Sequence, residues 1–179
     1  MERDYPDIPE EVVALGVGPN KVAKGYSGFI INRFKFHTKS HEENRMTQNS
    51  GVVNTSGVGS INYYGRLRDI IELDYYGNFK VVLFKSNWVD VHHNSGIRQN
   101  EFGFTLANYS RLIHTSEKLE HDPYVFSSQV EQVFYVQDPK NENWSTVIKA
   151  RPRDLFDKGV STMREDISNC LVPLNDETM

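Results

Sequence analysis

Two close pairs of histidines have a spacing that bears on metal binding: His37 with His41, and His92 with His93. Imidazoles four residues apart on a helix share one face and can bind zinc together. The residues around the first pair, HTKSHEEN, are typical of a loop, and the pattern H-E-x-x-H is absent. We therefore expect solvated loop histidines, no metal site and no cofactor.

Covalent catalysis and phosphoryl transfer leave sequence signals that this chain lacks. There is no G-x-S-x-G motif, and the two G-V-G triplets are not followed by G-K-[ST]. The single cysteine, Cys170, has no neighbour that would activate it. Asp69, Asp74 and Asp90 are expected at solvated strand ends and turns rather than around a catalytic metal. We expect no enzymatic activity and no small-molecule substrate.

Basic side chains gather between residues 21 and 45, where only Glu42 and Glu43 oppose them. Tyr26, Phe34 and Phe36 lie among them, and such a mixture can contact phosphates and stack on bases. In the alternative interpretation, the aromatic residues form the buried face of a hairpin and the lysines its solvated face. The candidate nucleic-acid-binding residues are Lys21, Lys24, Arg33, Lys35, Lys39 and Arg45.

Tyrosine and tryptophan residues offer a second kind of site, an aromatic cage that holds a methylated lysine by cation–π attraction. Neighbouring tyrosines on a strand point to opposite faces, so one member of each pair is expected to face outward. The ordinary alternative is a core with some surface tyrosines. The candidate cage residues are Tyr63, Tyr64, Tyr75, Tyr76, Trp88 and Tyr135.

The elements that must position these residues are short strands. Alternation over 26–37 predicts a hairpin that turns at Asn32-Arg33, and the polar stretch 38–60 predicts a long mobile loop with a brief strand near 52–53. Two strands around the turn dipeptide Gly77-Asn78 follow, with a bulge near Asp69. In the first, Leu67, Ile71 and Leu73 are expected on one face. The apolar run 81–84 predicts a second strand buried on both faces, with Val81 and Leu83 in the core.

Further strands are expected at 102–106, 132–137 and 144–149, and Pro9-Glu10-Glu11 predicts a short helix before them. The fold class is all-β or β-rich α+β: a small antiparallel barrel or curled sheet, with a short N-terminal helix and a loosely ordered C-terminal tail. We expect an acidic lead-in over 1–19, a single β-rich domain over 20–152, and a tail over 153–179.

Composition limits the class of protein. The chain has 179 residues, a net charge of −4 and 12% aromatic residues, which favours a globular domain and disfavours a wholly basic nucleic-acid binder. One cysteine cannot form an intrachain disulfide, the acidic first 16 residues do not resemble a secretory signal, and no apolar run approaches a membrane span. We expect an intracellular protein with no membrane partner.

Several segments together resemble a plant domain of unknown function that follows the transposase region in proteins of CACTA (En/Spm-type) transposons. They are TQNSGV (47–52), YYGRLRDIIELDY (63–75), KVVLFKSNWVDV (80–91), FGFT (102–105) and SQVEQVFYVQDPKNENWSTVIKARPRDLFD (128–157). The chain departs from the family at Ser86, where a cysteine is common, and at Gln99-Asn100-Glu101. The resemblance brings no catalytic residue with it.

The resemblance implies a plant, transposon-derived protein in the nucleus. We expect a non-enzymatic accessory module of a transposase, or a remnant of one, that binds DNA, chromatin or a protein partner such as the transposase itself. The alternative is a free-standing protein-interaction or structural domain with no nucleic-acid role.

Overall fold

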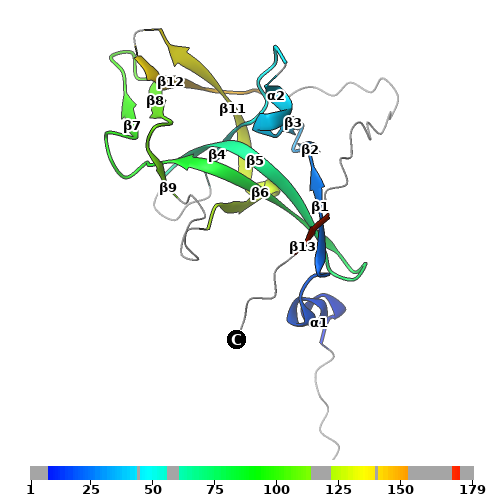
Figure 1. The fold of residues 1–179 in the computed structure, drawn as a ribbon. Helices are drawn as coiled ribbons and strands as arrows, with labels where there is room; N and C mark the ends of the chain where they lie inside the picture. Colours follow the sequence, from blue (N-terminus) through cyan, green and yellow to red (C-terminus); the bar gives the residue numbers. More distant parts are fainter. Residues whose placement is uncertain are drawn as a thin grey trace, which may run out of the picture.

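Short apolar runs separated by turn residues form a β-rich fold in the computed structural model of the chain, which describes residues 8–43, 45–55, 61–113, 122–139, 141–152 and 171–173 (Figure 1). The elements are α1 (Glu10–Val17), β1 (Val22–Tyr26), β2 (Gly28–Ile31), β3 (Phe34–His37), α2 (Lys39–Glu42), β4 (Gly51–Asn54), β5 (Tyr63–Asp74), β6 (Lys80–Val89), β7 (Ile97–Gln99), β8 (Thr105–Asn108), β9 (Leu112–Ile113), β10 (Tyr124–Phe126), the 3-10 turn η1 (Ser127–Gln129), β11 (Val130–Asp138), β12 (Asn141–Lys149) and β13 (Leu171–Pro173).

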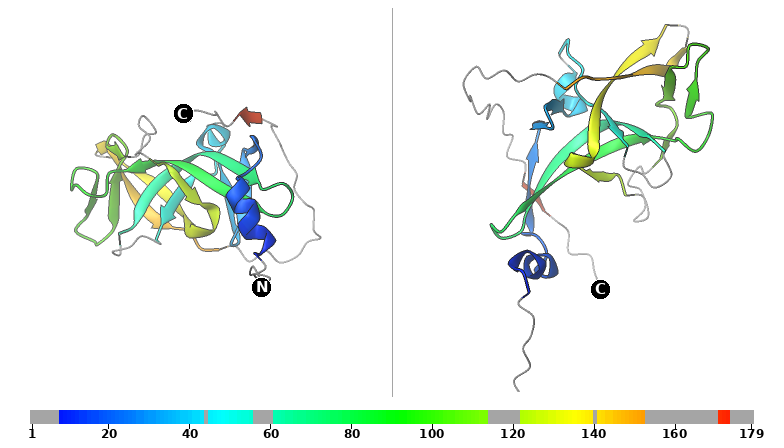
Figure 2. Two further views of the ribbon diagram at one scale, coloured as in Figure 1. Left: turned by 90° about the horizontal axis from the view of Figure 1, so that it is seen from below. Right: turned by 180° about the vertical axis from the view of Figure 1, so that it is seen from behind.

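The main sheet is antiparallel and strongly curled, in the order β10-β6-β5-β4-β11-β12-β8-β7 (Figures 1 and 2). Three short strands lie off this path: β1 pairs with β5 and β13, and β9 pairs with β6. The helix α1 lies beyond the end of β1, away from the curled sheet. The predicted fold class, a curled antiparallel sheet with a short N-terminal helix, is confirmed.

The hairpin of β5 and β6 is the longest in the sheet, and it contains the predicted bulge. The pairing steps from Leu67 opposite Ser86 to Asp69 opposite Lys85, which leaves one extra residue in β5. A bulge of this kind reverses the side-chain alternation beyond it. Leu67 and Ile70 are therefore the fully buried side chains of β5. The expectation that Ile71 and Leu73 share the face of Leu67 is wrong.

Two cores lie on the two faces of the sheet. Successive residues of a strand point to opposite faces and cross-strand partners point to the same face, so most strands contribute to both cores. The first core holds Phe34, Phe36, Val52, Leu67, Ile70, Phe84, Trp88, Val125 and Val130. The second core holds Val53, Tyr64, Val89, Ala107, Val133, Tyr135 and Val147. The expectation that Val81 and Leu83 are buried is wrong, since both are half-buried and Phe84 is the fully buried residue of the run 81–84.

The hairpin of β2 and β3 covers the first core, as its alternation predicts. Asn32 and Arg33 form the two-residue turn with φ of 50° and 65°, which matches a type I′ connection. Phe36 packs edge-on against Phe84 at 5.1 Å between ring centres, and Phe29 does so at 6.2 Å. The hairpin thus closes one face of β5 and β6.

The segment expected as a long loop over 38–60 contains two elements, and its residues 56–60 lie outside the described part. Glu42 in α2 is buried and accepts hydrogen bonds from the backbone N–H of Asn49 and, at 2.6 Å, from the hydroxyl of Ser50. Val52 and Val53 are fully buried because β4 lies between β5 and β11 in the sheet. The expectation of a long loop therefore misses the helix α2 and the buried contacts of this segment. The brief strand expected near 52–53 is present as β4.

The remaining strands differ from expectation mainly in their bounds. The strands expected at 132–137 and 144–149 are β11 and β12, while the one expected at 102–106 begins later, as β8. Most of the predicted tail lies outside the described residues. Its described part, β13, pairs with β1 through Val22 opposite Pro173, and no sequence signal indicated that pairing.

Candidate interaction surface

A rigid turn between β7 and β8 presents two phenylalanines to solvent. The side-chain oxygen of Asn100 accepts hydrogen bonds from the backbone N–H of Phe102 at 3.0 Å and of Phe104 at 2.9 Å. Gly103 supplies the positive φ, 79°, that the turn requires. Phe102 is 76% exposed and Phe104 is 53% exposed. The turn therefore holds two large apolar side chains in water instead of burying them.

The same face of the sheet continues from this turn across three strands. Phe134 on β11 lies opposite Ile148 on β12, and Val136 lies opposite Thr146. Thr146 in turn lies opposite Leu106 on β8, two residues from Phe104, so these side chains point to one side. We give the name outer apolar face to the residues on this side of the sheet together with Phe102 of the adjoining turn: Phe102, Phe104, Leu106, Phe134, Val136, Thr146 and Ile148.

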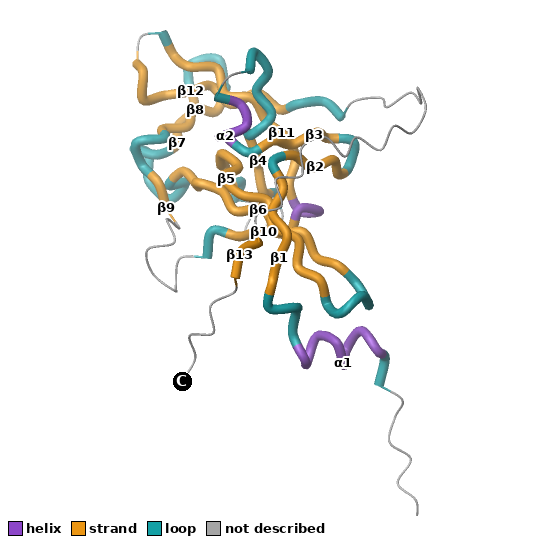
Figure 3. The backbone as a smooth tube through the Cα atoms, turned by 45° about the vertical axis from the view of Figure 1, so that its right-hand side comes forward, coloured by secondary structure: helices purple, strands orange, loops and turns teal. Residues whose placement is uncertain are grey.

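This face is only partly exposed, because Phe134 and Thr146 are half-buried and Leu106 is buried, 7% exposed. Val136 is 52% exposed and Ile148 is 44% exposed, while Val133, Tyr135 and Val147 on the opposite side of the same two strands fill the second core. Figure 3 shows β7, β8 and β12 together at one end of the molecule, with α1 at the other. The outer apolar face is thus far from the helix.

An arginine lies on the border of the outer apolar face. The guanidinium of Arg98 on β7 stacks 4.0 Å from the ring centre of Trp144 on β12. Trp144 is buried beneath it. Such a contact holds the arginine in place over an aromatic ring.

Sequence reasoning missed this surface. The continuous apolar run from Val133 to Val136 was a usable signal, because in a single strand such a run must place apolar side chains on both faces. Phe102 and Phe104, only two residues apart beside a glycine, were a second signal. Neither indicates which of the two faces is left open.

The six candidate nucleic-acid-binding residues follow one another along β1, the β2–β3 turn and α2, which lie along one side of the molecule (Figure 1). Lys21, Lys24, Arg33, Lys39 and Arg45 are exposed, and Lys35 is half-buried. The aromatic residues among them do not accompany them outward. Phe34 and Phe36 are buried in the first core, and the Tyr26 hydroxyl donates to Glu72 at 3.1 Å. The hairpin therefore follows the alternative interpretation, with a buried aromatic face and a solvated basic face.

The six candidate cage residues are dispersed. Tyr64 and Tyr135 lie in the second core. Trp88 lies in the first core, with Tyr63 packed against it. At the tip of the β5–β6 hairpin, Tyr75 stacks on Phe79 and Tyr76 is exposed. The structure brings only Tyr63 and Trp88 of this set to a common pocket. An open pocket of about 150 Å³ is lined by Asn54, Tyr63, Trp88, Asp122, Tyr124 and Val125.

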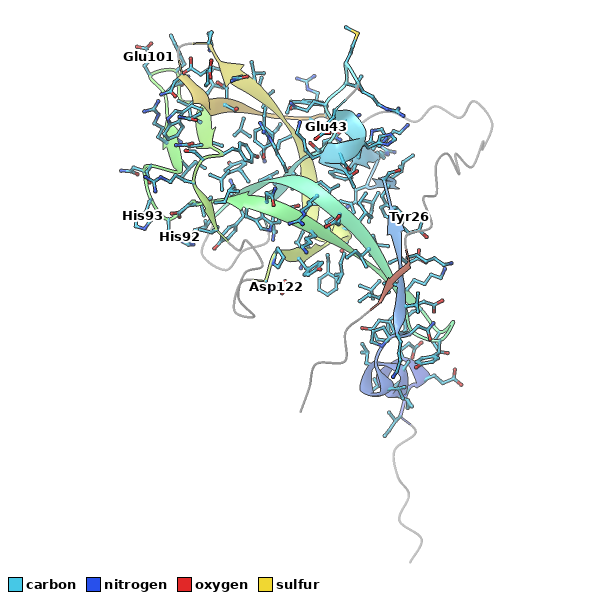
Figure 4. All side chains as sticks on the ribbon, in the orientation of Figure 1. Tyr26, Glu43, His92, His93, Glu101 and Asp122 are labelled. Carbon is cyan, nitrogen blue, oxygen red and sulfur yellow. The ribbon has the colours of Figure 1, made fainter. Side chains whose placement is uncertain are left out.

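Two features of that pocket make it a poor aromatic cage. The Trp88 indole is nearly fully buried and donates to the Pro123 carbonyl at 2.9 Å, so it offers little ring surface to a ligand. The amine of Lys85 lies 5.5 Å from the Tyr124 ring centre and already provides that ring with a cation. Figure 4 shows Asp122 beneath the sheet, on the far side from the labelled Glu101.

A polar cluster lies at the border of the second core. The Arg66 guanidinium stacks 3.9 Å from the Tyr109 ring centre, and the Tyr135 hydroxyl donates to the Gly65 carbonyl at 2.9 Å. Burial raises the pKa of the Tyr135 phenol, and burial together with the neighbouring Tyr135 raises the pKa of Tyr109 well above 10.0. Both phenols are therefore protonated and serve the fold as neutral groups.

A second polar set joins β1 to the sheet. Glu72 on β5 accepts from Tyr26 and lies 3.0 Å from the Lys80 amine. Partial burial and the Glu72 charge raise the pKa of Tyr26, and the hydrogen bond to Glu72 raises the pKa of Lys80. These residues stabilise the junction of β1 with the β5–β6 hairpin.

The two histidine pairs do not converge. His37 is buried at the end of β3, so the expectation of solvated loop histidines is wrong for this residue. Its ring centre lies 4.6 Å from that of His41 on α2, whereas Figure 4 places His92 and His93 at another edge of the molecule. Within the described residues, no three His, Cys, Asp or Glu side chains come together where they could hold a metal ion. Neither of the described α-helices, eight and four residues long, has the length and apolar character needed to cross a membrane.

Comparison with known proteins adds a family match without a function. Residues 71–147 match the model of a family described as "Domain of unknown function (DUF4216)". No curated protein and no solved structure matches the chain. The matched region runs from β5 to β12 and includes most of the outer apolar face. The match supports a domain of unknown function, as the sequence resemblance implied.

Proposed function

We propose that this chain is a non-enzymatic interaction module that binds a protein partner through the outer apolar face. The observation that carries the proposal is the exposure of Phe104, Val136 and Ile148 on one side of the sheet, beside the exposed Phe102 of the adjoining turn. Contiguous exposed apolar patches of this kind mark interaction sites in soluble proteins. The supporting turn at Asn100 keeps the patch ordered, which reduces the entropy cost of binding.

The composition of the face fits a protein partner. Aromatic residues and arginine are enriched in protein interfaces, whereas lysine, glutamate and aspartate are depleted. The outer apolar face contains three phenylalanines, and Arg98 on β7 lies opposite Leu106 on the same side of the sheet. By contrast, the small pocket beside Asp122 has too little exposed ring surface to dominate binding.

The biological setting is part of the same proposal. The resemblance to a domain of plant CACTA transposon proteins favours an accessory module of a transposase, located in the nucleus with the DNA that the transposase handles. The family match over 71–147 supports the domain and leaves its role open. A protein partner in this setting is the transposase itself or a chromatin protein.

Site-specific photo-cross-linking in plant cells tests the proposal. A photoreactive amino acid at position 136, in the middle of the face, is expected to give discrete adducts. The matched control is position 30, because Ile30 is 51% exposed on the outer side of β2, away from the outer apolar face. Substituting Ile148→Lys should remove the adducts at 136, since a charge in the patch opposes its desolvation. Equal labelling at 136 and 30, or none at 136, would refute the proposal.

Nucleic acid is the second candidate partner, favoured by the exposed cations along β1 and α2. Residues 21–45 carry six basic and two acidic side chains in a chain whose net charge is −4, so charge is segregated. Neutralising three phosphates would give a slope of log K against log salt of about −3 on duplex DNA. Replacing Lys24, Lys39 and Arg45 with alanine should flatten that slope.

The control for the DNA experiment replaces three exposed cations elsewhere, Arg68, Arg111 and Lys149. These variants should keep the slope of the native chain. A slope that is unchanged by the first triple substitution, or flattened equally by both, would remove nucleic acid as a partner of this surface.

A further inference from the structure

We propose that the protein partner of the outer apolar face places a carboxylate, the side chain of an Asp or Glu among apolar residues, on the guanidinium of Arg98. This inference deepens, and rests on, the proposed function. Arg98 on β7 lies opposite Leu106 on β8. The same row continues through Thr146 on β12 to Val136 on β11. Cross-strand partners point to the same side of a sheet, so the arginine stands at one end of a row that crosses the face.

The ring beneath the guanidinium holds it in one place. Trp144 lies two residues from Thr146 on β12 and therefore points to the same side of the sheet. Trp144 is buried, and its ring centre lies 4.0 Å from the guanidinium carbon of Arg98, whose own side chain is exposed. Stacking uses the flat face of a guanidinium and leaves the N–H donors around its edge available. An arginine fixed in this way loses less conformational entropy when it binds a carboxylate.

The charge of Arg98 is not neutralised within the part of the chain that the structure describes. Among these residues, ion pairs join Arg68 to Asp69, Lys80 to Glu72 and Lys149 to Glu131, but no carboxylate pairs with Arg98. Glu101 lies in the turn between β7 and β8 (Figure 4), and Glu142 lies two residues before Trp144; both are exposed and neither forms an ion pair with the arginine. Complementary charge orients protein partners, so a carboxylate from the partner fits this position.

The surroundings of Arg98 define the rest of the partner's segment. Phe104 lies two residues before Leu106 and is 53% exposed, and Val136 at the other end of the row is 52% exposed. The strands from β7 to β11 are successive neighbours in the sheet, ~4.8 Å apart, so Arg98 and Val136 are separated by about 14 Å. An extended segment rises ~3.3 Å per residue, so its acid and the apolar residue that covers Val136 are about four residues apart.

A single guanidinium fits a carboxylate better than a phosphate. Arginine and a carboxylate form two parallel charge-assisted hydrogen bonds. Phosphorylated motifs are instead recognised by clusters of arginines. Among the described residues of the paired rows on this side of the sheet, Arg98 is the one cation. The partner's segment is therefore acidic and apolar, without a requirement for phosphorylation.

The cross-linking experiment with a photoreactive residue at position 136 tests the role of Arg98 in the full chain. Arg98→Gln removes the charge, and Arg98→Met removes it while keeping an unbranched apolar side chain over Trp144. Both should lower the yield of the adduct at least about tenfold, because the partner's carboxylate is then left unpaired. Arg111→Gln changes another exposed arginine and should leave the yield unchanged. Thermal melts show whether each variant is folded.

The covalent complex identifies the partner's acid directly. The adduct at position 136 is purified from the Arg98→Lys variant and treated with a water-soluble carbodiimide, which activates carboxyl groups. The amine introduced at position 98 then attacks the activated carboxyl, an amide bond forms, and the carbodiimide leaves as its urea. Mass spectrometry should find this amide on an Asp or Glu of the partner. The adduct from the Arg111→Lys variant, treated in the same way, should give no amide between position 111 and the partner.

The outcomes separate this inference from the proposed function. Full adduct yield at 136 in the folded Arg98→Gln and Arg98→Met variants overturns the inference and leaves the proposed function standing. Full yield in Arg98→Met alone assigns Arg98 a merely structural role over Trp144 and overturns the inference equally. An adduct that joins two copies of this chain, a phosphorylated partner residue opposite position 98, or the absence of an amide to the partner also overturns it. The absence of any adduct at 136 refutes the proposed function itself, and this inference with it.

Discussion

Replacing Phe84 with alanine is the most informative test of how the sheet is packed. Phe84 lies on β6, opposite Ile70 and Val125 in the pairing, and its side chain is fully buried in the first core. The neighbouring Leu83 is half-buried on the other side of the strand. The two adjacent residues therefore make a matched pair that reports which side of β6 faces the first core.

The size of the effect follows from the contacts of the ring. Burying a phenylalanine removes ~200 Å² from water, which at ~25 cal/mol per Å² is about 5 kcal/mol as an upper value. Alanine recovers part of that, but the edge-on contacts with Phe36 and Phe29 are lost and a cavity remains. We expect Phe84→Ala to lower the free energy of unfolding by about 3–5 kcal/mol. For Leu83→Ala we expect about 1 kcal/mol, because its environment is already half solvent.

Urea unfolding followed by tryptophan fluorescence measures both changes. A loss of 3–5 kcal/mol is a large part of the ~5–15 kcal/mol that holds a domain together, so Phe84→Ala should unfold at a much lower urea concentration. If Leu83→Ala costs as much as Phe84→Ala, or more, then the assignment of the Phe84 side of β6 to the first core is wrong. The placement of the bulge in β5 would then be wrong as well.

Three further predictions concern single contacts. Gly51→Ala should destabilise the chain strongly, because the new Cβ would collide with the Val133 carbonyl. Gly16→Ala on α1 is the matched control: its Cβ meets no atom within 4 Å, and it should stabilise the helix by about 0.5–1 kcal/mol. Thermal melts of the two variants measure both effects. Glu42→Ala should cost about 3 kcal/mol in urea unfolding because it leaves two buried donors without their acceptor. Burial raises the phenol pKa values of Tyr109 and Tyr135, so near pH 10.0 these two phenols ionise only in the unfolded chain. Their contribution to stability should therefore be constant below that pH and fall above it, and the fall should be less steep in Tyr135→Phe. Urea midpoints at about pH 9 and 11 measure the change.

Local chemistry made the hairpins predictable. The alternation around Asn32-Arg33 and the turn dipeptide at Gly77 each specify a connection between adjacent strands, and both connections are present. The misplaced polar residue Asp69 was enough to indicate a bulge. Such signals act over a few residues, so they survive without knowledge of the rest of the fold.

Tertiary context decided the features that were missed. The run from Val81 to Phe84 is apolar throughout, so alternation cannot identify Phe84 as its buried member. The segment before β4 is polar, yet Glu42 is buried because the backbone and hydroxyl groups of Asn49 and Ser50 satisfy its carboxylate. The outer apolar face could not be predicted for the same reason. The sequence pattern of an apolar strand face is the same whether the fold covers that face or leaves it exposed.

The central claim is that the outer apolar face is covered by protein in the cell, and hydroxyl-radical footprinting measures that directly. The chain is labelled in plant cells and, in parallel, as dilute purified protein, and the modification of individual side chains is compared. We predict that Phe104 and Ile148 are protected in cells relative to the dilute protein, while Ile30, with similar exposure on another surface, is modified equally in both. Equal modification of Phe104 and Ile148 in the two samples would contradict the claim.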